Sequence, residues 1–384
     1  MTVALDRIVI TGVGVASPLG HTREALFAGL LAGRTAICEH EDLARAGYRV
    51  PRAARIADLD GDPLRRGRCL ALLAAERAVL DARVDLAPDC GVFVGSTLGE
   101  SFAFESAAEG RSDLALDDYG VRSFGEAIQA RFRLRGKLSA VATACAAGNY
   151  ALGAALHALQ RGQLRMAVAG ASEPFSRLSL VGFSRSRAMA ADSCRPFDAA
   201  HSGMSLAEGA AMFVLESARS ALQRGARPLA EVAALGLSCD AHHPTAPEPE
   251  GRGMLAAMKH ALAGAQLELS ELDWINVHGS GTRASDSAET KAIGALCAER
   301  MPLLSGSKGA LGHALGAASA LETAICVQGL CEQMVPPTAG HSTAIDPKVA
   351  CTTQPTRRVL RSVMNNAFAF GGVNSALVLR SWRD

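Results

Sequence analysis

Short apolar runs alternate with amphipathic or alanine-rich stretches along the whole chain. The apolar runs predict strands over residues 7–15, 91–95, 138–143, 166–171, 210–215, 228–239, 274–277, 303–305, 359–364 and 375–380. The amphipathic and alanine-rich stretches predict helices over residues 22–31, 69–84, 146–160, 254–263, 285–300 and 314–332. Strands that alternate with helices indicate an α/β fold whose sheets are largely buried.

Two stretches lack a clear period. Residues 100–135 are polar and weakly patterned, and we expect a helical excursion or cap there. A loop rich in Ser and Arg is expected after the strand at 166–171. These stretches add to the α/β core without changing its class.

Gly12 and Gly14 end the first strand in a pattern that is typical of dinucleotide-binding motifs. Ser17 stands where the third glycine would be, and no acidic residue ends a following strand at the right distance. We therefore predict no dinucleotide site.

Composition limits the classes of protein that fit. The 384 residues suffice for two domains or one two-part core, and with 49% hydrophobic but only 4% aromatic residues the interior must be filled by small and aliphatic side chains. The net charge of +1 gives no basic excess for nucleic acid, and no stretch has the length of a membrane span. The N-terminus lacks the basic start and long apolar run of a signal peptide.

Ten cysteines are spread singly, without a CxxC pair or a disulfide-type spacing. We expect a reducing, cytoplasmic setting. The adjacent His242 and His243 are interpreted as loop or pocket structure, and no metal site is predicted.

Cys145 stands where a strand expected to be buried, residues 138–143, runs directly into the alanine-rich helix at 146–160. The backbone N–H groups at a helix start lack intrahelical partners, and the helix dipole there favours negative charge. A thiol in that turn is biased towards the nucleophilic thiolate. A single free cysteine is more often a buried, inert residue, so the prediction of a nucleophile depends on other residues.

The stretch that begins at Cys145 has a faint echo at His313, since both open a helix rich in Ala and Gly after a strand and a turn. A duplicated fold would bring the two helix starts to one centre. Small residues at this spacing also suit two helices that pack closely in a core.

Three further stretches carry candidate chemistry. His278 leaves a predicted strand into a Gly-Ser-Gly-Thr loop, Lys308 and His313 flank a glycine-lined helix start, and Phe370 precedes a pair of glycines. Each alone is more often structural. A cysteine and two histidines, each at a strand end beside glycine, are much less expected by chance.

In combination and in this order, these motifs resemble the β-ketoacyl-[acyl-carrier-protein] synthases of the elongating type, in the thiolase-like superfamily. The resemblance runs nearly end to end from Ile10. It rests on Thr143-Ala-Cys145-Ala-Ala-Gly, Arg195-Pro-Phe-Asp198, Glu208-Gly-Ala-Ala, Asp240-Ala-His-His-Pro-Thr245, His278-Gly-Ser-Gly-Thr282, Lys308 with Gly312-His313, and Phe370-Gly-Gly.

The resemblance implies a thiolase-like fold, with two similar α/β halves over about 1–230 and 231–384 in αβαβα layers. It also implies decarboxylative condensation of an acyl group on Cys145 with malonyl-[acyl-carrier-protein], in fatty acid or specialised polyketide or polyene synthesis. A thiolate is both a good nucleophile and a good leaving group. His278 and His313 would hold the negative charge that decarboxylation builds on the thioester oxygen.

Further roles come from the resemblance alone. The backbone N–H groups of Cys145 and Phe370 would form an oxyanion hole, and Phe370 would gate the acyl pocket. Lys308 and Glu322 would organise the histidines, while Ser280 and Thr282 would hold the phosphopantetheine arm.

The implied partner is acyl carrier protein, which is acidic, and Arg65, Arg66 and Arg68 match the basic residues with which the family docks its carrier; Arg195 is a weaker candidate. The family also implies a homodimer, or a heterodimer with a ketosynthase-like subunit. It implies no metal or redox cofactor.

Several positions depart from the family pattern. Residues 100–135 are shorter than in the housekeeping enzymes, His201 and Ser202 replace a charged pair, and Ala367, Ala369 and Val373 replace the usual residues around Phe370. With Arg283 in the histidine loop, these changes favour a specialised pathway at least as much as housekeeping elongation. Ala369 also adds a methyl group that would stiffen the gate.

Three alternative functions fit the sequence less well. A non-catalytic partner subunit usually lacks the cysteine and often a histidine, whereas this chain keeps Cys145, His278 and His313. A thiolase brings a second catalytic cysteine near the C-terminus, where this chain has Phe370-Gly-Gly. A serine hydrolase is disfavoured because no GxSxG motif occurs.

Overall fold

The computed structural model describes residues 6–111 and 118–382. Ten strands form the main sheet: β1 (Ile8–Ala16), β4 (Gly91–Gly95), β5 (Leu138–Val141), β6 (Met166–Glu173), β8 (Gly209–Ser217), β9 (Ala230–Cys239), β10 (Trp274–Asn276), β11 (Leu303–Ser305), β14 (Ser362–Ala369) and β15 (Val373–Ser381). Short strands make two smaller sheets: β2 (Cys38–Glu39), β3 (Arg52–Ala54) and β7 (Leu206–Ala207), and β12 (Met334–Val335) with β13 (Thr356–Arg357).

Helices connect most of these strands and confirm the predicted α/β class. They are α1 (Arg23–Leu31), α2 (Glu41–Arg45), α3 (Arg66–Ala82), α4 (Ser101–Ala108), α5 (Arg122–Phe132), α6 (Ala147–Gln160), α7 (Arg177–Arg185), α8 (Ala218–Gln223), α9 (Arg252–Gly264), α10 (Arg283–Leu296), α11 (Lys308–Leu311) and α12 (Ala318–Glu332). Short 3₁₀ turns precede or link several of them: η1 (Pro63–Arg65), η3 (Ala144–Ala146), η4 (Leu269–Glu271), η5 (Leu315–Ala317) and η6 (Phe370–Gly372).

The strand order of the main sheet shows an internal duplication. From the centre outwards, one side runs β1-β8-β6-β4-β5 and the other runs β9-β15-β14-β10-β11. If the strands of each set are numbered in chain order, both sides read first, fifth, fourth, second, third. Both sets also have two antiparallel pairings followed by two parallel ones. The two sets of strands therefore share one topology.

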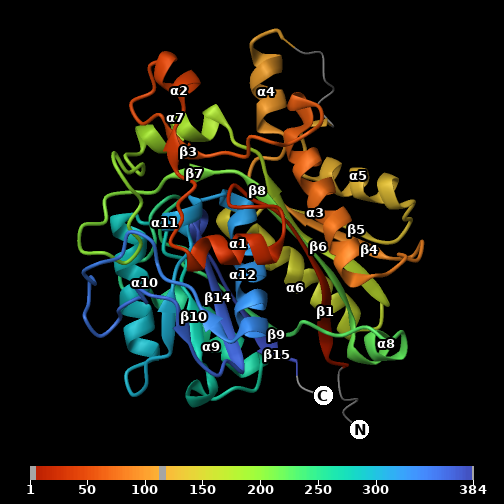
Figure 1. The fold of residues 1–384 in the computed structure, drawn as a ribbon. Coiled ribbons are helices and arrows are strands. Elements are labelled where there is room, and N and C mark those ends of the chain that lie inside the picture. Colours follow the sequence, from red (N-terminus) through yellow and green to blue (C-terminus); the bar gives the residue numbers. More distant parts are fainter. Residues whose placement is uncertain (1–5, 112–117, 383–384) are drawn as a thin grey trace.

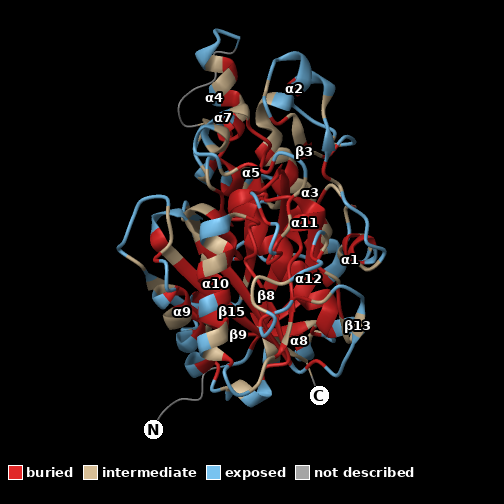
Figure 2. Ribbon diagram, turned by 90° about the vertical axis from the view of Figure 1, so that its left-hand side faces the viewer, coloured by how far each residue is buried: buried red, intermediate tan, exposed pale blue. Residues whose placement is uncertain are grey.

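Helices cover the two strand sets on both faces and give five layers. The helices α3 and α5 pack on the outer face of the first set, and α9 and α10 lie outside the second (Figure 1). The helices α6 and α12 lie between, since each contacts strands of both sets. This central layer is thoroughly buried, whereas α2 and the tip of α4 are exposed (Figure 2).

The starts of α6 and α12 meet at the centre, as the echo in the sequence predicted. A side chain at Gly148 would collide with the backbone of Ala320, so the close approach of the two helices requires a glycine there. The register of the echo was wrong, however. Cys145 is the middle residue of η3, and Gly316 is the middle residue of η5, so Cys145 corresponds to Gly316 rather than to His313.

The strand before Cys145 also differs from the prediction. It ends at Val141. Ala140 is exposed and the other three residues are partly buried, because β5 lies at the edge of the sheet and pairs with β4 alone. The outer row of backbone N–H and C=O groups of an edge strand has no neighbouring strand to pair with.

Other differences concern helices. The helix expected at 314–332 begins with η5 and becomes α-helical only at Ala318. The loop expected after β6 contains α7, which Ser176 caps by accepting a hydrogen bond from the N–H of Ser179. The excursion expected at 100–135 holds α4 and α5, while residues 112–117 lie outside the described part of the chain.

Gly12 and Gly14 allow β1 to pack closely against α3. Side chains at these positions would collide with the backbone carbonyls of Ala78 and Ala74 in α3. No helix in the described part of the chain is long and apolar enough to cross a membrane.

Candidate active site

Cys145 lies in η3, between the edge strand β5 and the central helix α6. The preceding Ala144 has φ 47°, a left-handed conformation that is uncommon for residues other than glycine. Cys145 is 9% exposed. Burial raises the pKa of its thiol to about 12, against the pull of the Lys308 ammonium, and the Glu173 carboxylate adds to the rise. The expectation of a thiolate was therefore wrong for the free protein, because burial outweighs the position near a helix start.

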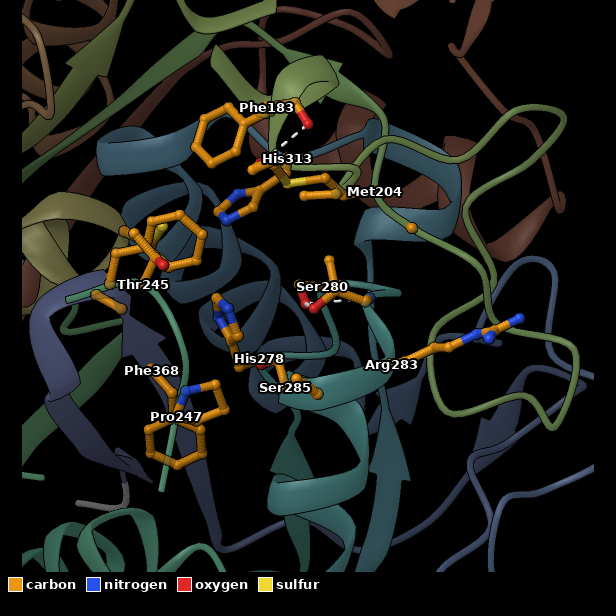
Figure 3. A pocket seen from close by; sticks show the side chains of 18 of the residues that line it. Phe183, Met204, Thr245, Pro247, His278, Ser280, Arg283, Ser285, His313 and Phe368 are labelled. Carbon is orange, nitrogen blue, oxygen red and sulfur yellow. Dashed lines mark hydrogen bonds between the residues drawn. The ribbon is translucent and has the colours of Figure 1, made fainter. Parts of the chain in front are cut away.

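His278 and His313 face each other across the same pocket (Figure 3). Their ring centroids are 5.5 Å apart and the rings are nearly perpendicular. Burial and then the charge of Lys308 hold both pKa values well below the usual value, so both imidazoles are neutral at pH 7. A neutral imidazole has one N–H donor and one acceptor nitrogen. The pocket thus holds a thiol and two neutral imidazoles.

The two histidines enter the pocket from different elements. His278 follows β10, as predicted, whereas His313 follows the short helix α11 and not a strand. The Glu289 carboxylate fixes the loop after β10 by accepting hydrogen bonds from the backbone N–H groups of His278 (2.8 Å) and Gly279 (2.9 Å). Sequence reasoning did not single out Glu289, which lies 11 residues after His278 in the chain.

Lys308 lies beneath the histidines and is 1% exposed. Its ammonium donates to Glu322 Oε1 at 2.6 Å and to the backbone carbonyl of His278. Lys308 thus contacts the main chain of His278. Glu322 also accepts from the Ser307 hydroxyl at 3.1 Å, and burial raises its pKa.

Phe370 begins η6, where Gly371 and Gly372 have φ 81° and 69°. Phe370 is 40% exposed, and its ring packs against Phe183 of α7, with the ring centroids 5.6 Å apart. Sequence reasoning missed Phe183 because it expected a loop there. Position 369 precedes this turn in an extended conformation, which alanine adopts without strain.

One pocket of about 420 Å³ joins these groups, and Ser280 and Thr282 lie in its wall. The two hydroxyl oxygens are 2.9 Å apart. Thus the pocket contains Cys145, both histidines, the two hydroxyls and Phe370, while Lys308 and Glu322 lie behind its wall.

The predicted docking arginines lie elsewhere, where η1 passes into α3. Arg66 is bound to the buried Glu208 carboxylate at 2.7 Å, and Arg68 to Asp118 at 2.6 Å. Arg65 is the most exposed of the three, with its nearest carboxylates 3.9 Å away. Docking by these residues stays a prediction, and their placement favours Arg65. Arg195 also lies outside the pocket wall and is paired with Asp192 at 2.8 Å.

A second carboxylate missed by the sequence connects the two halves of the site. Glu173, at the end of β6, accepts hydrogen bonds from the backbone N–H groups of Thr97, Leu98 and Gly316. It joins the loop after β4 to η5, which follows His313. The signal was an acidic residue at the end of a buried strand.

Comparison with known proteins agrees with this geometry. The family model described as β-ketoacyl synthase, N-terminal domain, matches residues 5–221, and that for the C-terminal domain matches residues 229–342. An actinorhodin polyketide putative β-ketoacyl synthase 1 from Streptomyces coelicolor is 35% identical, over 97% of this chain and 88% of the relative. A 3-oxoacyl-[acyl-carrier-protein] synthase 2 from Rhizobium meliloti is 33% identical, over 98% of this chain and 99% of the relative.

Among solved structures, the ishigamide ketosynthase/chain length factor superposes with a TM-score of 0.92 at 34% identity, covering 99% of this chain and 100% of that one. These matches confirm the predicted thiolase-like fold. The chain therefore belongs to the β-ketoacyl synthase family and is an acyltransferase.

Proposed function

We propose that the chain joins an acyl group held on Cys145 to malonyl-[acyl-carrier-protein], with loss of carbon dioxide, to give β-ketoacyl-[acyl-carrier-protein]. One observation carries the proposal. Cys145, His278 and His313 come from three separate elements, are each buried and line one pocket. A partner subunit without catalysis has no need for this combination.

In the first step, the Cys145 sulfur attacks the thioester carbonyl of the acyl donor. Because the free thiol is protonated, a neutral imidazole accepts its proton as the sulfur–carbon bond forms. The carrier thiolate then leaves and takes that proton. The tetrahedral oxyanion would be held by the backbone N–H groups of Cys145 and Phe370.

In the second step, malonyl carrier protein loses carbon dioxide, and negative charge develops on its thioester oxygen. Neutral His278 and His313 can each donate one N–H to that oxygen without carrying a charge of their own. The carbanion attacks the acyl-enzyme carbonyl, and Cys145 leaves as a thiolate that takes up a proton from water.

Lys308 and Glu322 are proposed to position this pair of histidines. The Lys308 ammonium holds the backbone of His278, and its charge helps to keep both rings neutral. The proposal includes no metal or redox cofactor, since the nucleophile and the proton acceptors are side chains of the chain.

The substrates are proposed to arrive on the phosphopantetheine arm of acyl carrier protein, past Ser280 and Thr282 in the pocket wall. Arg65 is the proposed docking residue with the greatest exposure. Phe370 is proposed to gate the acyl pocket through its contact with Phe183.

A dimer is also proposed, either of two copies of this chain or with a ketosynthase-like subunit. The open edge of β5 supports it, as does a relative whose structure is titled as a ketosynthase/chain length factor. The pathway is fatty acid synthesis or, at least equally supported, specialised polyketide or polyene synthesis, in the cytoplasm.

The test is reconstitution with malonyl carrier protein and a panel of acyl carrier proteins, read by the mass of the carrier-bound product. Wild type should give the donor acyl group extended by a decarboxylated malonyl unit. Cys145→Ala should give none while keeping its circular dichroism spectrum. Equal product from Cys145→Ala would contradict the proposal, and no product from folded wild type would favour the partner-subunit alternative.

A further inference from the structure

Two exposed arginines in the pocket wall, Arg187 and Arg283, have no acidic partner among the described residues. Arg283 opens α10 and lines the pocket, with only a long contact, 3.5 Å, from its Nε to the backbone carbonyl of His201. Arg187 lines the same pocket and is exposed. No carboxylate in the described ranges forms an ion pair with either of them, whereas Arg66 and Arg224 are both paired with buried glutamates.

The rest of the pocket wall offers these guanidinium groups little negative charge. Among the described residues, Asp240 is the one carboxylate in the wall. Its Oδ1 accepts from Asn374 Nδ2 at 2.6 Å, and its Oδ2 accepts from the backbone N–H of Glu248 at 3.0 Å. The pocket wall at the two arginines is therefore cationic, with the hydroxyl groups of Ser186, Ser202 and Ser285 in the same wall.

The loop from His278 to Arg283 leads from the reacting groups to the surface. His278 is 3% exposed and Ser280 is 4% exposed, Thr282 is half-buried, and Arg283 is exposed. The Arg283 side chain points away from the two histidines (Figure 3). A long, narrow ligand with its thioester beside Cys145 would follow this loop outwards and end at the arginine.

We propose that Arg283, with Arg187, forms a subsite for a phosphate ester at the outer end of the bound arm. This inference rests on the proposed function. A guanidinium presents a fork of donors that matches phosphate oxygens, and it keeps its charge at every working pH. The phosphate ester can come from carrier-bound phosphopantetheine or from coenzyme A, which share this chemistry.

Binding is measured by calorimetry on Cys145→Ala, with 4′-phosphopantetheine and with pantetheine, which lacks the phosphate. Arg283→Gln should weaken binding of phosphopantetheine about three- to fivefold, the value of an exposed ion pair, and leave pantetheine unchanged. Arg187→Gln should act in the same direction, and added salt should reduce the difference between the two compounds.

Arg161→Gln is the matched control, because Arg161 is exposed, directly follows the last residue of α6 and lies outside the pocket wall. It should change neither binding constant. An equal loss for both compounds in Arg283→Gln would mean a structural role and would overturn the subsite, as would no loss for either.

A kinetic comparison distinguishes the two sources of phosphate. A larger rise in KM for acyl carrier protein than for acyl coenzyme A would assign the subsite to the carrier-bound arm, and the reverse would assign it to coenzyme A. The binding experiment needs no turnover. A wild type that binds phosphopantetheine but condenses nothing would therefore contradict the proposed function and leave the subsite in place.

Discussion

At the scale of residues, the site is a neutral surface above one buried ion pair. The thiol and both imidazoles are uncharged at pH 7, while Lys308 and Glu322 carry the charge below them. Local sequence predicted the identity of these residues but not the protonation of Cys145. That depends on burial and on Lys308 and Glu173, which are distant in the chain.

Alkylation of Cys145 should continue to accelerate as the pH rises through 8 and 9. Below its pKa the thiolate fraction rises about tenfold per pH unit. Iodoacetamide labelling, read on the Cys145 peptide by mass spectrometry, separates this residue from the exposed Cys38, Cys239 and Cys331. Lys308→Met should slow labelling at each pH. A rate that is already level at pH 7 would contradict the account.

Decarboxylation of malonyl carrier protein should stay nearly constant as the pH falls from 8 to 6. Both imidazoles have pKa values well below 6.5, so they remain neutral as the pH passes the usual value. Carbon dioxide release measures the rate. As a control, each sample is returned to pH 8 and should recover its full rate, which excludes denaturation. A loss of rate with a midpoint near 6.5 would show that the histidines titrate as exposed ones do.

Lys308→Met should lower the free energy of unfolding by about 3–5 kcal/mol, because it leaves the buried Glu322 carboxylate without its partner. The double variant Lys308→Met/Glu322→Gln removes that charge and should recover a large part of the loss. Urea denaturation compares the three proteins. If the double variant were less stable than Lys308→Met, the ion pair would not be the cause.

At the scale of elements, the spacing of hydrophobic residues predicted most strands and helices, but not which strand lies at the edge of the sheet or how deeply each element is buried. The sequence predicted that β5 is buried, yet this strand forms the edge of the sheet. The helix α7 was missed because its apolar side chains do not share one face: Leu178 and Val181 are exposed while Leu180 is buried. Phe183 was missed with it.

Ala140→Pro should weaken the proposed dimer without disturbing β4. In the register of β5 with β4, Ser139 and Val141 face β4, so the backbone N–H of Ala140 points outwards. Proline removes that donor from an edge strand. Light scattering should show a shift from twice the chain mass towards the monomer, while Ala140→Val stays dimeric. If both variants remained dimeric, the dimer interface would not include the edge of β5, and the prediction would be wrong.

At the scale of the whole molecule, duplication explains where the site lies. The two strand sets share one topology, and their central helices α6 and α12 begin side by side, next to Cys145 and His313. The sequence shows this duplication as a faint similarity between the stretches at Cys145 and His313. The alignment of the two stretches could not be predicted, since small residues suit many packing arrangements. The pairing of Arg66 with Glu208 could not be predicted either, because the two residues are 142 positions apart in the chain and no local pattern indicates the contact.

Intact-protein mass spectrometry of a single turnover tests the central claim most directly. Wild type and Cys145→Ala are incubated with acyl carrier protein, separated from it, and then mixed with malonyl carrier protein. The account predicts that wild type alone gains the acyl mass and loses it on the second addition, as carrier-bound β-ketoacyl product appears. An acyl mass on Cys145→Ala, or one on wild type that malonyl carrier protein does not remove, would contradict condensation at Cys145.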